Sequence, residues 1–350
     1  MNEKVVLLDP TIGSFNKGDE VIINSFKQVM KSWLRDKDVY SLPTHLPICT
    51  ENECRHMNER MEFFQNQSLK FLVGTDIIAK GRMYLYNQWN VNHKNYLPLS
   101  NTICLAVGLS AGVPKPRINP FNKIIFKKNT KDFYQNIFSH DYIHSTRDEA
   151  TAEYLRELGF QAVNTGCVTT WMLTPAFCKS IPTNKSDSVI FTLNCRKMDQ
   201  KNDIQLIGLL QKLYNHLYFF PQQWKDIEYF NSLSFSNKEQ IQMIPINIEA
   251  LQSYFQREVD YVGLRLHCGI FAMQHRKRSI IIEVDHRSSD LSKDQNLNLA
   301  VRGDLLKLEA MIHSELVTDI HVNYENINTF LSQFGVELIV TDTTTNIKML

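Results

Sequence analysis

Short apolar runs alternate along the whole chain with longer stretches of helical periodicity, and this alternation restricts the fold more than any other feature. The apolar runs are rich in β-branched residues and include "VVLLD" from Val5, "TICLAVG" from Thr102 and "VIFTLN" from Val189. Stretches such as "IQLIGLLQKLYNHL", from Ile204, separate them, and the helix predicted in "STRDEATAEYLRELGF", from Ser145, is expected to be capped by Thr146. Such alternation is typical of βα units around a parallel sheet. The sequence therefore predicts an α/β protein.

The chain is long enough for two domains. It has 350 residues, of which 43% are hydrophobic, and a single domain usually holds about 100–200 residues. The segment "CKSIPTNKSDS" is polar, contains a proline and has no apolar period, so it is typical of a connection. We predict an N-terminal domain at residues 1–177, a linker at 178–187 and a C-terminal domain at 188–350. The last helix and strand are expected to pack back on the N-terminal domain.

Composition limits the partners and the location. Lys and Arg number 38 against 37 Asp and Glu, so nothing at the level of the whole chain favours nucleic acid. The seven cysteines are an odd number without a repeated spacing, as expected for reduced thiols in the cytoplasm. No apolar run approaches the roughly 18 residues of a membrane span. We expect a cytoplasmic protein, and peripheral membrane association and homo-oligomerisation stay open.

The N-terminal stretch "VVLLDPTIGSFNKGDEVIINSF" predicts a strand, a glycine-containing loop and a helix that begins near Gly18. Such a turn directs backbone N–H groups at an incoming anion. The spacing of Gly13 and Gly18 fits neither a Walker loop nor a dinucleotide fingerprint. Asp19 and Glu20 fall in the first helical turn, where the helix dipole stabilises carboxylates, so capping is the alternative to a catalytic role.

The stretch "DYVGLRLHCGIFAMQHRKRSIIIEVD", from Asp260, predicts a βαβ unit in which "DYVGLRLH" is a strand, "CGIFAMQH" a helix and "SIIIEVD" the next strand. Arg265 and His267 then lie at the carboxyl end of its first strand and at the start of its helix. Ligands of open α/β sheets bind at this edge, and a helix N-terminus adds N–H donors for an anion. Arg265 contributes a planar, permanently charged guanidinium group, and His267 is able to exchange a proton near neutral pH. A lone histidine is more often structural, but its neighbours favour a site.

Other charged residues take equivalent positions in their own βα units. Asp285 and Arg287 follow the next strand and would share its rim, with a surface ion pair as the alternative. Arg147 and Arg196 also follow strands, although an ion pair with Asp148 or Glu149 is the alternative for Arg147. These positions predict a local cationic rim rather than a basic surface.

The sequence lacks the motifs of several common functional sites. The segment "CTENECRH" has no second Cys/His pair at zinc spacing, so we expect no metal. The basic run "HRKRS" lies between a helix end and a strand, where cations suit the helix dipole. No Gly-x-Ser-x-Gly elbow, HExxH or kinase set is present. Transfer chemistry on an anionic substrate remains.

Three blocks of the chain resemble the polysaccharide pyruvyl transferases. They are "GSFNKGDEVI", then "HSTRDEATAEYLRELGF" with "NTGC", and finally "GLRLHCGIFA" with "IIIEVDHRSSDL". The resemblance implies two Rossmann-like domains facing across a cleft, the GT-B arrangement. It also implies attachment of pyruvate from phosphoenolpyruvate, as a ketal, to a sugar of a cell-surface polysaccharide or its precursor. Val168 replaces a common proline and Cys268 a common glycine, which affects substrate detail more than fold.

The resemblance also implies roles. The N-terminal domain is expected to bind the acceptor, a sugar or lipid-linked oligosaccharide, and the C-terminal domain the donor phosphoenolpyruvate, without a cofactor. The tripeptide Arg265-Leu266-His267 matches the donor site of the family. The candidate catalytic residues are His267, Arg265 and Asp19. The candidate substrate-binding residues are Asn16, Gly18, Arg147, Asn194, Arg196, Leu266, Asp285 and Arg287.

Two other functions stay open at this point. A glycosyltransferase of the GT-B class that uses a nucleotide sugar would share the architecture and the basic rim. A non-catalytic, anion-binding subunit of polysaccharide assembly would keep the fold without the chemistry.

Overall fold

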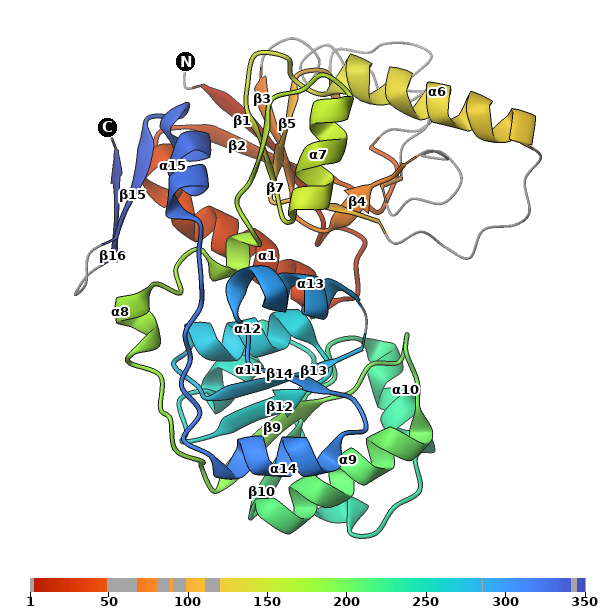
Figure 1. The fold of residues 1–350 in the computed structure, drawn as a ribbon, viewed down its shortest axis with the longest axis vertical. Coiled ribbons are helices and arrows are strands. Elements are labelled where there is room, and N and C mark those ends of the chain that lie inside the picture. Colours follow the sequence, from red (N-terminus) through yellow and green to blue (C-terminus); the bar gives the residue numbers. More distant parts are fainter. Residues whose placement is uncertain are drawn as a thin grey trace.

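The computed structural model describes residues 3–48, 68–80, 89–90, 99–110, 120–284, 286–340 and 345–349. It contains two parallel sheets, one above the other in Figure 1, with helices α1 (Lys17–Val29) and α12 (Leu266–Gln274) lying between them. The α/β class predicted from the alternation of apolar runs is confirmed. The segment "CTENECRH" lies outside the described residues.

The first sheet is parallel throughout and has the strand order β2-β1-β3-β5. Its strands are β1 (Lys4–Asp9), β2 (Asp38–Pro43), β3 (Ser68–Val73) and β5 (Thr102–Leu105). Apolar side chains of α1, including Ile22, Ile23 and Phe26, pack in one cluster with those of β1, β3 and β5. This packing brings the loop between β1 and α1 to the carboxyl edge of the sheet.

Side chains join this sheet to a further pair of parallel strands, β7 (His144–Thr146) and β8 (Ala162–Asn164). The Cys104 N–H donates to Nδ1 of His144 at 3.0 Å, and the Ala106 N–H donates to Oγ of Ser145 at 2.9 Å. Nε2 of His144 lies 2.9 Å from the Ser139 carbonyl oxygen and therefore carries the ring proton. Burial lowers the pKa of this fully buried, neutral histidine to about 4.

His144 should make the stability of the fold depend on pH. The unfolded chain takes up a proton at His144 below pH 6.5, whereas the folded protein does so only below about 4. Stability from this residue is therefore complete above pH 6.5 and falls by about 3 kcal/mol as the pH drops to 4. Denaturant unfolding at several pH values measures the slope. In His144→Asn, whose Oδ1 replaces Nδ1 as acceptor, most of this slope should disappear; an unchanged slope would contradict the assignment.

The second sheet is parallel throughout and has the order β11-β10-β9-β12-β13-β14. Counted along the chain from β9, this is the order of dinucleotide-binding folds, with the reversal between β9 and β12. Its strands are β9 (Ser188–Thr192), β10 (His216–Phe219), β11 (Gln242–Met243), β12 (Asp260–Gly263), β13 (Ser279–Glu283) and β14 (Leu299–Val301). The crevice outside the carboxyl ends of β9 and β12 is the expected ligand site of such a sheet.

Helices connect the strands of this second sheet. They are α9 (Gln200–Leu213), α10 (Trp224–Ser232), α11 (Ile248–Tyr254), α12 and α13 (His286–Gln295), and α14 (Leu305–His313) follows the last strand. Shorter or separate elements are α2 (Lys31–Leu34), β4 (Asp76–Ile78), β6 (Gly108–Leu109), α6 (Pro120–Ile137), η2 (Val168–Thr170), α8 (Pro175–Cys178) and η3 (Lys238–Gln240). No helix within the described ranges is both long and apolar enough to cross a membrane.

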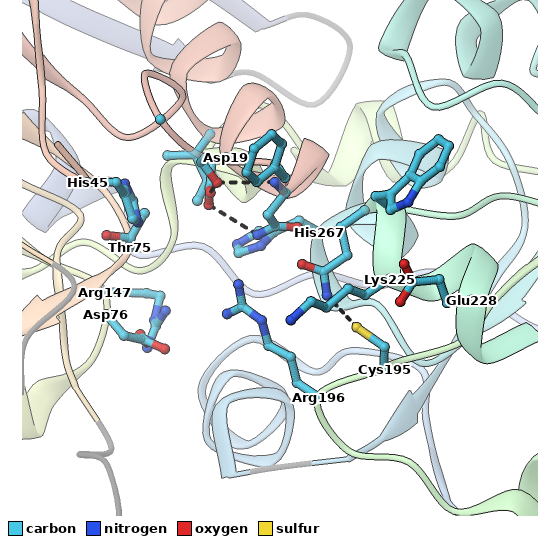
Figure 2. A pocket seen from close by; sticks show the side chains of 17 residues that line it. Asp19, His45, Thr75, Asp76, Arg147, Cys195, Arg196, Lys225, Glu228 and His267 are labelled. Carbon is cyan, nitrogen blue, oxygen red and sulfur yellow. Dashed lines mark hydrogen bonds and ion pairs between the residues drawn. The ribbon is translucent and has the colours of Figure 1, made fainter.

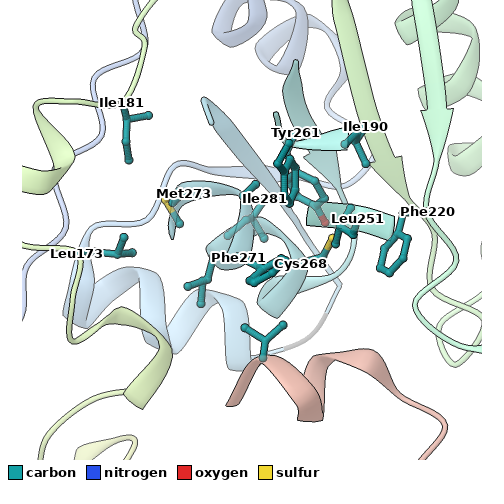
Figure 3. Packing of buried hydrophobic residues seen from close by; sticks show 14 of the residues in the cluster. Leu173, Ile181, Ile190, Phe220, Leu251, Tyr261, Cys268, Phe271, Met273 and Ile281 are labelled. Carbon is teal, nitrogen blue, oxygen red and sulfur yellow. The ribbon is translucent and has the colours of Figure 1, made fainter. Parts of the chain in front are cut away.

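Helix α12 is fixed by packing from both halves of the chain (Figure 3). Its Cys268 and Phe271 belong to a buried cluster that also holds Tyr261 of β12. The same cluster includes Val21 of α1 and Leu173, which come from the first half. Helix α12 is therefore held against α1.

The C-terminal segment returns to the first sheet (Figure 1). It forms α15 (Tyr324–Ser332) and the antiparallel hairpin of β15 (Val336–Val340) and β16 (Thr345–Met349). Phe330 and Phe334 share the cluster of α1 and β1, and the Phe334 and Trp33 rings lie 5.6 Å apart. The last elements thus bury apolar surface against the first ones.

Two details differ from the sequence prediction. Thr146 does not cap the helix after Ser145, because it belongs to β7; α7 (Glu149–Glu157) is capped by Asp148, whose carboxylate accepts the Thr151 N–H. Asp148 directly precedes the first helical residue, Glu149, and its carboxylate makes that bond at 2.8 Å, whereas Thr146 is the last residue of β7. The helix after β12 also begins earlier than predicted, at Leu266, with Arg265 as its N-cap.

The basic run "HRKRS" supports the fold. Arg278 is buried, forms a 3.0 Å ion pair with Asp260, and donates to the carbonyl oxygens of Met311 and Ile312 near the end of α14. A cation at the carboxyl end of a helix interacts favourably with its dipole. Arg278 therefore ties α14 to β12 rather than forming part of a basic surface.

Candidate active site

A pocket of about 670 Å³ is lined by residues of both halves of the chain. The first half contributes Asn16 from the loop before α1, Asp19 from the first turn of α1, and Arg147, which follows β7. The second half contributes Arg196 after β9 and His267 at the start of α12. A smaller cavity of about 120 Å³ shares Asn16, Arg196 and His267 and lies at the β9–β12 reversal. Both hollows thus open at the edge where α/β sheets bind ligands.

Asp19 is held in place by the loop that precedes α1. Its side chain is only 7% exposed, and its oxygens accept hydrogen bonds from Ser14 Oγ at 2.5 Å and from Asn16 Nδ2 at 3.3 Å. Asn16 itself caps α1, because its Oδ1 accepts the Gly18 N–H. Asp19 is therefore an oriented carboxylate at the pocket wall, with a defined position relative to the helix.

The same loop is bonded to the second half. Gln222 Nε2 donates to Asn16 Oδ1 at 2.6 Å, and the Lys17 N–H donates to the Gln222 carbonyl oxygen at 2.9 Å. A Cβ atom on Gly18 would lie 2.9 Å from Gln222 Nε2 and 3.4 Å from the His267 Cβ. Gly18 is not itself a lining residue, but its lack of a side chain permits this close approach.

His267 lies in the first turn of α12 and is half-buried. Its Nε2 is 3.7 Å from Sγ of Cys167, and burial raises the pKa of that thiol, so Cys167 stays protonated. Figure 2 shows the imidazole ring next to the Asp19 carboxylate, with both groups at the wall of the pocket. A carboxylate and an imidazole so placed can exchange protons with a bound substrate.

Arg265 is committed to a buried network. Its Nη2 forms an ion pair and hydrogen bond with Asp226, which is fully buried, and its Nε donates to the Leu193 carbonyl oxygen at 3.0 Å. Asp226 also accepts the N–H groups of Gln222 and Gln223. Nη1 has no hydrogen-bond partner within the described part of the chain. Arg265 thus holds the loops around the smaller cavity in place, and Nη1 is the one nitrogen of its guanidinium group that is left for a ligand there.

Arg147 lies at the opposite wall and is 7% exposed. Its Nη2 forms an ion pair with Asp76, and the 3.9 Å separation from the Asp148 carboxylate marks a much weaker contact. Its position is set by its backbone N–H, which donates to the Val107 carbonyl oxygen at 2.8 Å. At this wall of the pocket the charge of Arg147 is therefore balanced by that of Asp76.

Gly108→Ala should disturb the Arg147 wall. A Cβ atom there would lie 2.6 Å from Nη2 and 2.8 Å from Cζ of Arg147, and 3.0 Å from the Asp76 carboxylate. We expect a loss of about 1–3 kcal/mol in the free energy of unfolding and weaker substrate binding, because the ion pair must shift. Gly208→Ala is the matched control, since nothing lies within 4 Å of its Cβ; in α9 it should gain about 1 kcal/mol. Equal effects in both variants would contradict the steric argument.

Two other cations of the pocket carry no ion pair within the described residues. Arg196 follows β9 and Lys225 lies in the first turn of α10; both are exposed and line the pocket. Figure 2 shows both side chains extending into it. Asn194 fixes the loop, because its Oδ1 accepts the Arg196 N–H at 3.0 Å. These two side chains are the natural partners of an added anion.

The structure brings most of the predicted site residues together. Asn16, Asp19, Arg147, Arg196 and His267 line the main pocket, and Asn194, Arg265 and Leu266 line the smaller cavity. Asp285 lies outside the described residues, as does the side chain of Arg287. No group of three metal-ligating side chains occurs in the described ranges.

Sequence reasoning missed the contribution of α10. Trp224, Lys225 and Glu228 all line the main pocket, as does His45 after β2. In the sequence, the segment "YFFPQQWKDIEYFN" is notable only for its aromatic residues. The segment forms a strand, a short loop and a helix, as does the stretch that contains α12. The rule that ligands bind at the carboxyl ends of parallel strands therefore applies to Trp224 and Lys225 as it does to Arg265 and His267.

The chain combines an α/β fold with a pocket that is lined by charged side chains at the carboxyl edges of its parallel sheets. A family model described as polysaccharide pyruvyl transferase matches residues 7–286, which is more than half of the chain. The chain belongs to the polysaccharide pyruvyl transferase family. The resemblance noted in the sequence is thereby confirmed, and membership supports transferase activity in polysaccharide biosynthesis.

Comparison with solved structures supports the fold. A structure of S. aureus MnaA with UDP matches with a TM-score of 0.50 over 91% of this chain and 92% of that chain. The two sequences are 10% identical, so the likeness concerns architecture alone. No curated protein matches the chain.

Proposed function

We propose that this protein transfers the pyruvyl group of phosphoenolpyruvate to two hydroxyls of a sugar as a ketal. In this proposal two Rossmann-like domains in the GT-B arrangement enclose the pocket, with the donor on the C-terminal side. The observation that carries it is the group of cations and His267 at the β9–β12 reversal of a chain in this family. The acceptor is a sugar of a cell-surface polysaccharide or its precursor.

The donor presents two anionic groups, a phosphate and a carboxylate, which need cationic partners. Arg196 and Lys225 are exposed in the pocket and have no ion pair among the described residues, so they bind the donor without giving up another contact. The N-terminus of α12 adds backbone N–H donors and a favourable dipole. Nη1 of Arg265 completes this side of the smaller cavity.

The reaction conserves its protons. As the first sugar hydroxyl adds to C2 of the donor, a proton reaches C3 and converts the methylene group to a methyl group. The C2–O bond to phosphate then breaks, and the second hydroxyl adds to C2 and gives up its proton, which leaves with the phosphate. In our proposal His267 supplies the proton to C3 or assists the departing phosphate, and Asp19 accepts a proton from the acceptor.

A ligand screen tests the proposal against its rivals. Phosphoenolpyruvate, UDP-glucose and GDP-mannose are each added to the full chain while its thermal unfolding is followed. A ligand at 100 times its dissociation constant stabilises the folded state by about 2.7 kcal/mol. A shift with phosphoenolpyruvate alone supports the proposal. A shift with a nucleotide sugar alone would favour a glycosyltransferase, and no shift with any of them would favour a non-catalytic subunit; either result overturns it.

A further inference from the structure

Two aromatic rings at the main pocket are unusually exposed. Phe15 is 80% exposed and Trp224 is 63% exposed, whereas the next exposed aromatic residue of the described chain, Tyr40, is 38% exposed. Both rings line the pocket, and they come from opposite halves: Phe15 precedes the N-cap of α1, and Trp224 begins α10. Each ring leaves apolar surface in water at a cost of roughly 25 cal/mol per Å². A ligand with an apolar face would recover it.

The polar groups beside Trp224 limit what that ligand is. Glu228 follows Trp224 by one helical turn, so both side chains lie on the same face of α10, and both line the pocket. The Glu228 carboxylate is exposed and has no ion pair within the described residues. A carboxylate accepts hydrogen bonds from neighbouring hydroxyl groups. An aromatic face next to such an acceptor suits a ligand that combines C–H faces with hydroxyl edges.

The donor does not fit this part of the pocket. Phosphoenolpyruvate is small and doubly anionic, so Glu228 would repel it, and it offers no extended apolar face. The pocket of about 670 Å³ is in the range of sites for larger molecules and leaves room beside the donor. A pyranose ring has the missing properties, because its axial C–H groups form apolar faces and its hydroxyls lie around the edge.

We propose that Phe15 and Trp224 form the acceptor subsite, in which they contact the faces of a pyranose ring while Glu228 accepts hydrogen bonds from its hydroxyls. This inference rests on the proposed function, which supplies a sugar as the second substrate. The subsite combines residues of both halves, so it binds the acceptor beside Asp19 and His267, which line the same pocket.

Tryptophan fluorescence reports on this subsite without any turnover. The chain has four tryptophans, and Trp33, Trp89 and Trp171 are at most 7% exposed, so acrylamide should quench chiefly Trp224. Methyl glycosides of galactose, glucose and N-acetylglucosamine serve as probes, with UDP as a comparison. We expect at least one glycoside to protect the accessible fluorescence, and Trp224→Phe to lack that component. Protection by UDP but by no glycoside would overturn the proposal.

Kinetics provide the second measurement, with the glycoside that gives the highest turnover. Phe15→Ala and Trp224→Ala should each raise the KM for the glycoside by about three- to tenfold, while the KM for phosphoenolpyruvate stays unchanged. Trp224→Phe should retain most of the affinity. Leu306→Ala, which removes an apolar side chain that is 83% exposed and lies outside the pocket, is the control.

The outcomes separate the subsite from the proposed function. Turnover with an unchanged glycoside KM in both alanine variants would overturn the subsite and leave pyruvyl transfer intact. Protection of Trp224 by a glycoside without any turnover of phosphoenolpyruvate would support the subsite and contradict the proposed function.

Discussion

His267→Ala should lower kcat by about 10²–10⁴-fold, the usual contribution of one positioned acid or base. The side chain is half-buried in the first turn of α12 and lies beside Cys167 and Asp19. His45, the other histidine among the described pocket residues, comes from the loop after β2. Release of phosphate from phosphoenolpyruvate in the presence of a sugar acceptor measures the effect. Circular dichroism should show the fold unchanged.

His275→Asn is the matched control for this prediction. His275 caps the other end of α12, and its Nδ1 lies 2.8 Å from the Phe271 carbonyl oxygen, away from the pocket. The variant should keep its turnover within a fewfold of the native protein. If His267→Ala retained full turnover, His267 would not be the acid or base of this reaction.

Arg265→Met should have the largest effect on stability among substitutions at the site. Breaking a buried ion pair by removing one partner typically costs about 3–5 kcal/mol, because the remaining charge is uncompensated. Here the remaining charge is Asp226, which is fully buried and also accepts the N–H groups of Gln222 and Gln223. Urea unfolding measures the loss. Turnover should fall as well, because the Gln222 loop bonds to Asn16 and Lys17 at the pocket wall.

The double variant Arg265→Met with Asp226→Asn separates the two effects. Removal of both charges should restore part of the lost stability, whereas turnover should stay low because the donor has lost a contact. If the double variant were as unstable as Arg265→Met, the buried charge would not be the cause. Recovery of full turnover in the double variant would show that Arg265 contributes only to the fold.

The alternation of apolar runs was enough to predict the class of fold and the edge of the sheet at which Arg265 and His267 lie. Arg265 and His267 were located correctly because residues that follow a buried strand must lie at its carboxyl end. The strand order was not predictable in the same way, since parallel strands that are neighbours in space, such as β9 and β12, are separated by two other strands along the chain.

The buried ion pair between Arg265 and Asp226 could not be predicted from the sequence either. Asp226 lies 39 positions from Arg265 on another helix, and no periodicity relates the two residues. The prediction that Thr146 caps the following helix was wrong for a local reason. Strand β7 ends at Thr146 and α7 begins at Glu149, so Asp148, which directly precedes the helix, is its cap. The α10 residues were missed because an aromatic-rich segment gives no indication of which rings stay exposed.

Product analysis by mass spectrometry and NMR tests the central claim most directly. The full chain is incubated with phosphoenolpyruvate and the methyl glycosides, and in parallel with the nucleotide sugars and the same glycosides. We predict a glycoside that carries a pyruvate ketal, with one phosphate released for each ketal formed, and no product from the nucleotide sugars. Unmodified glycosides with phosphoenolpyruvate, together with a glycosylated product from a nucleotide sugar, would contradict the account.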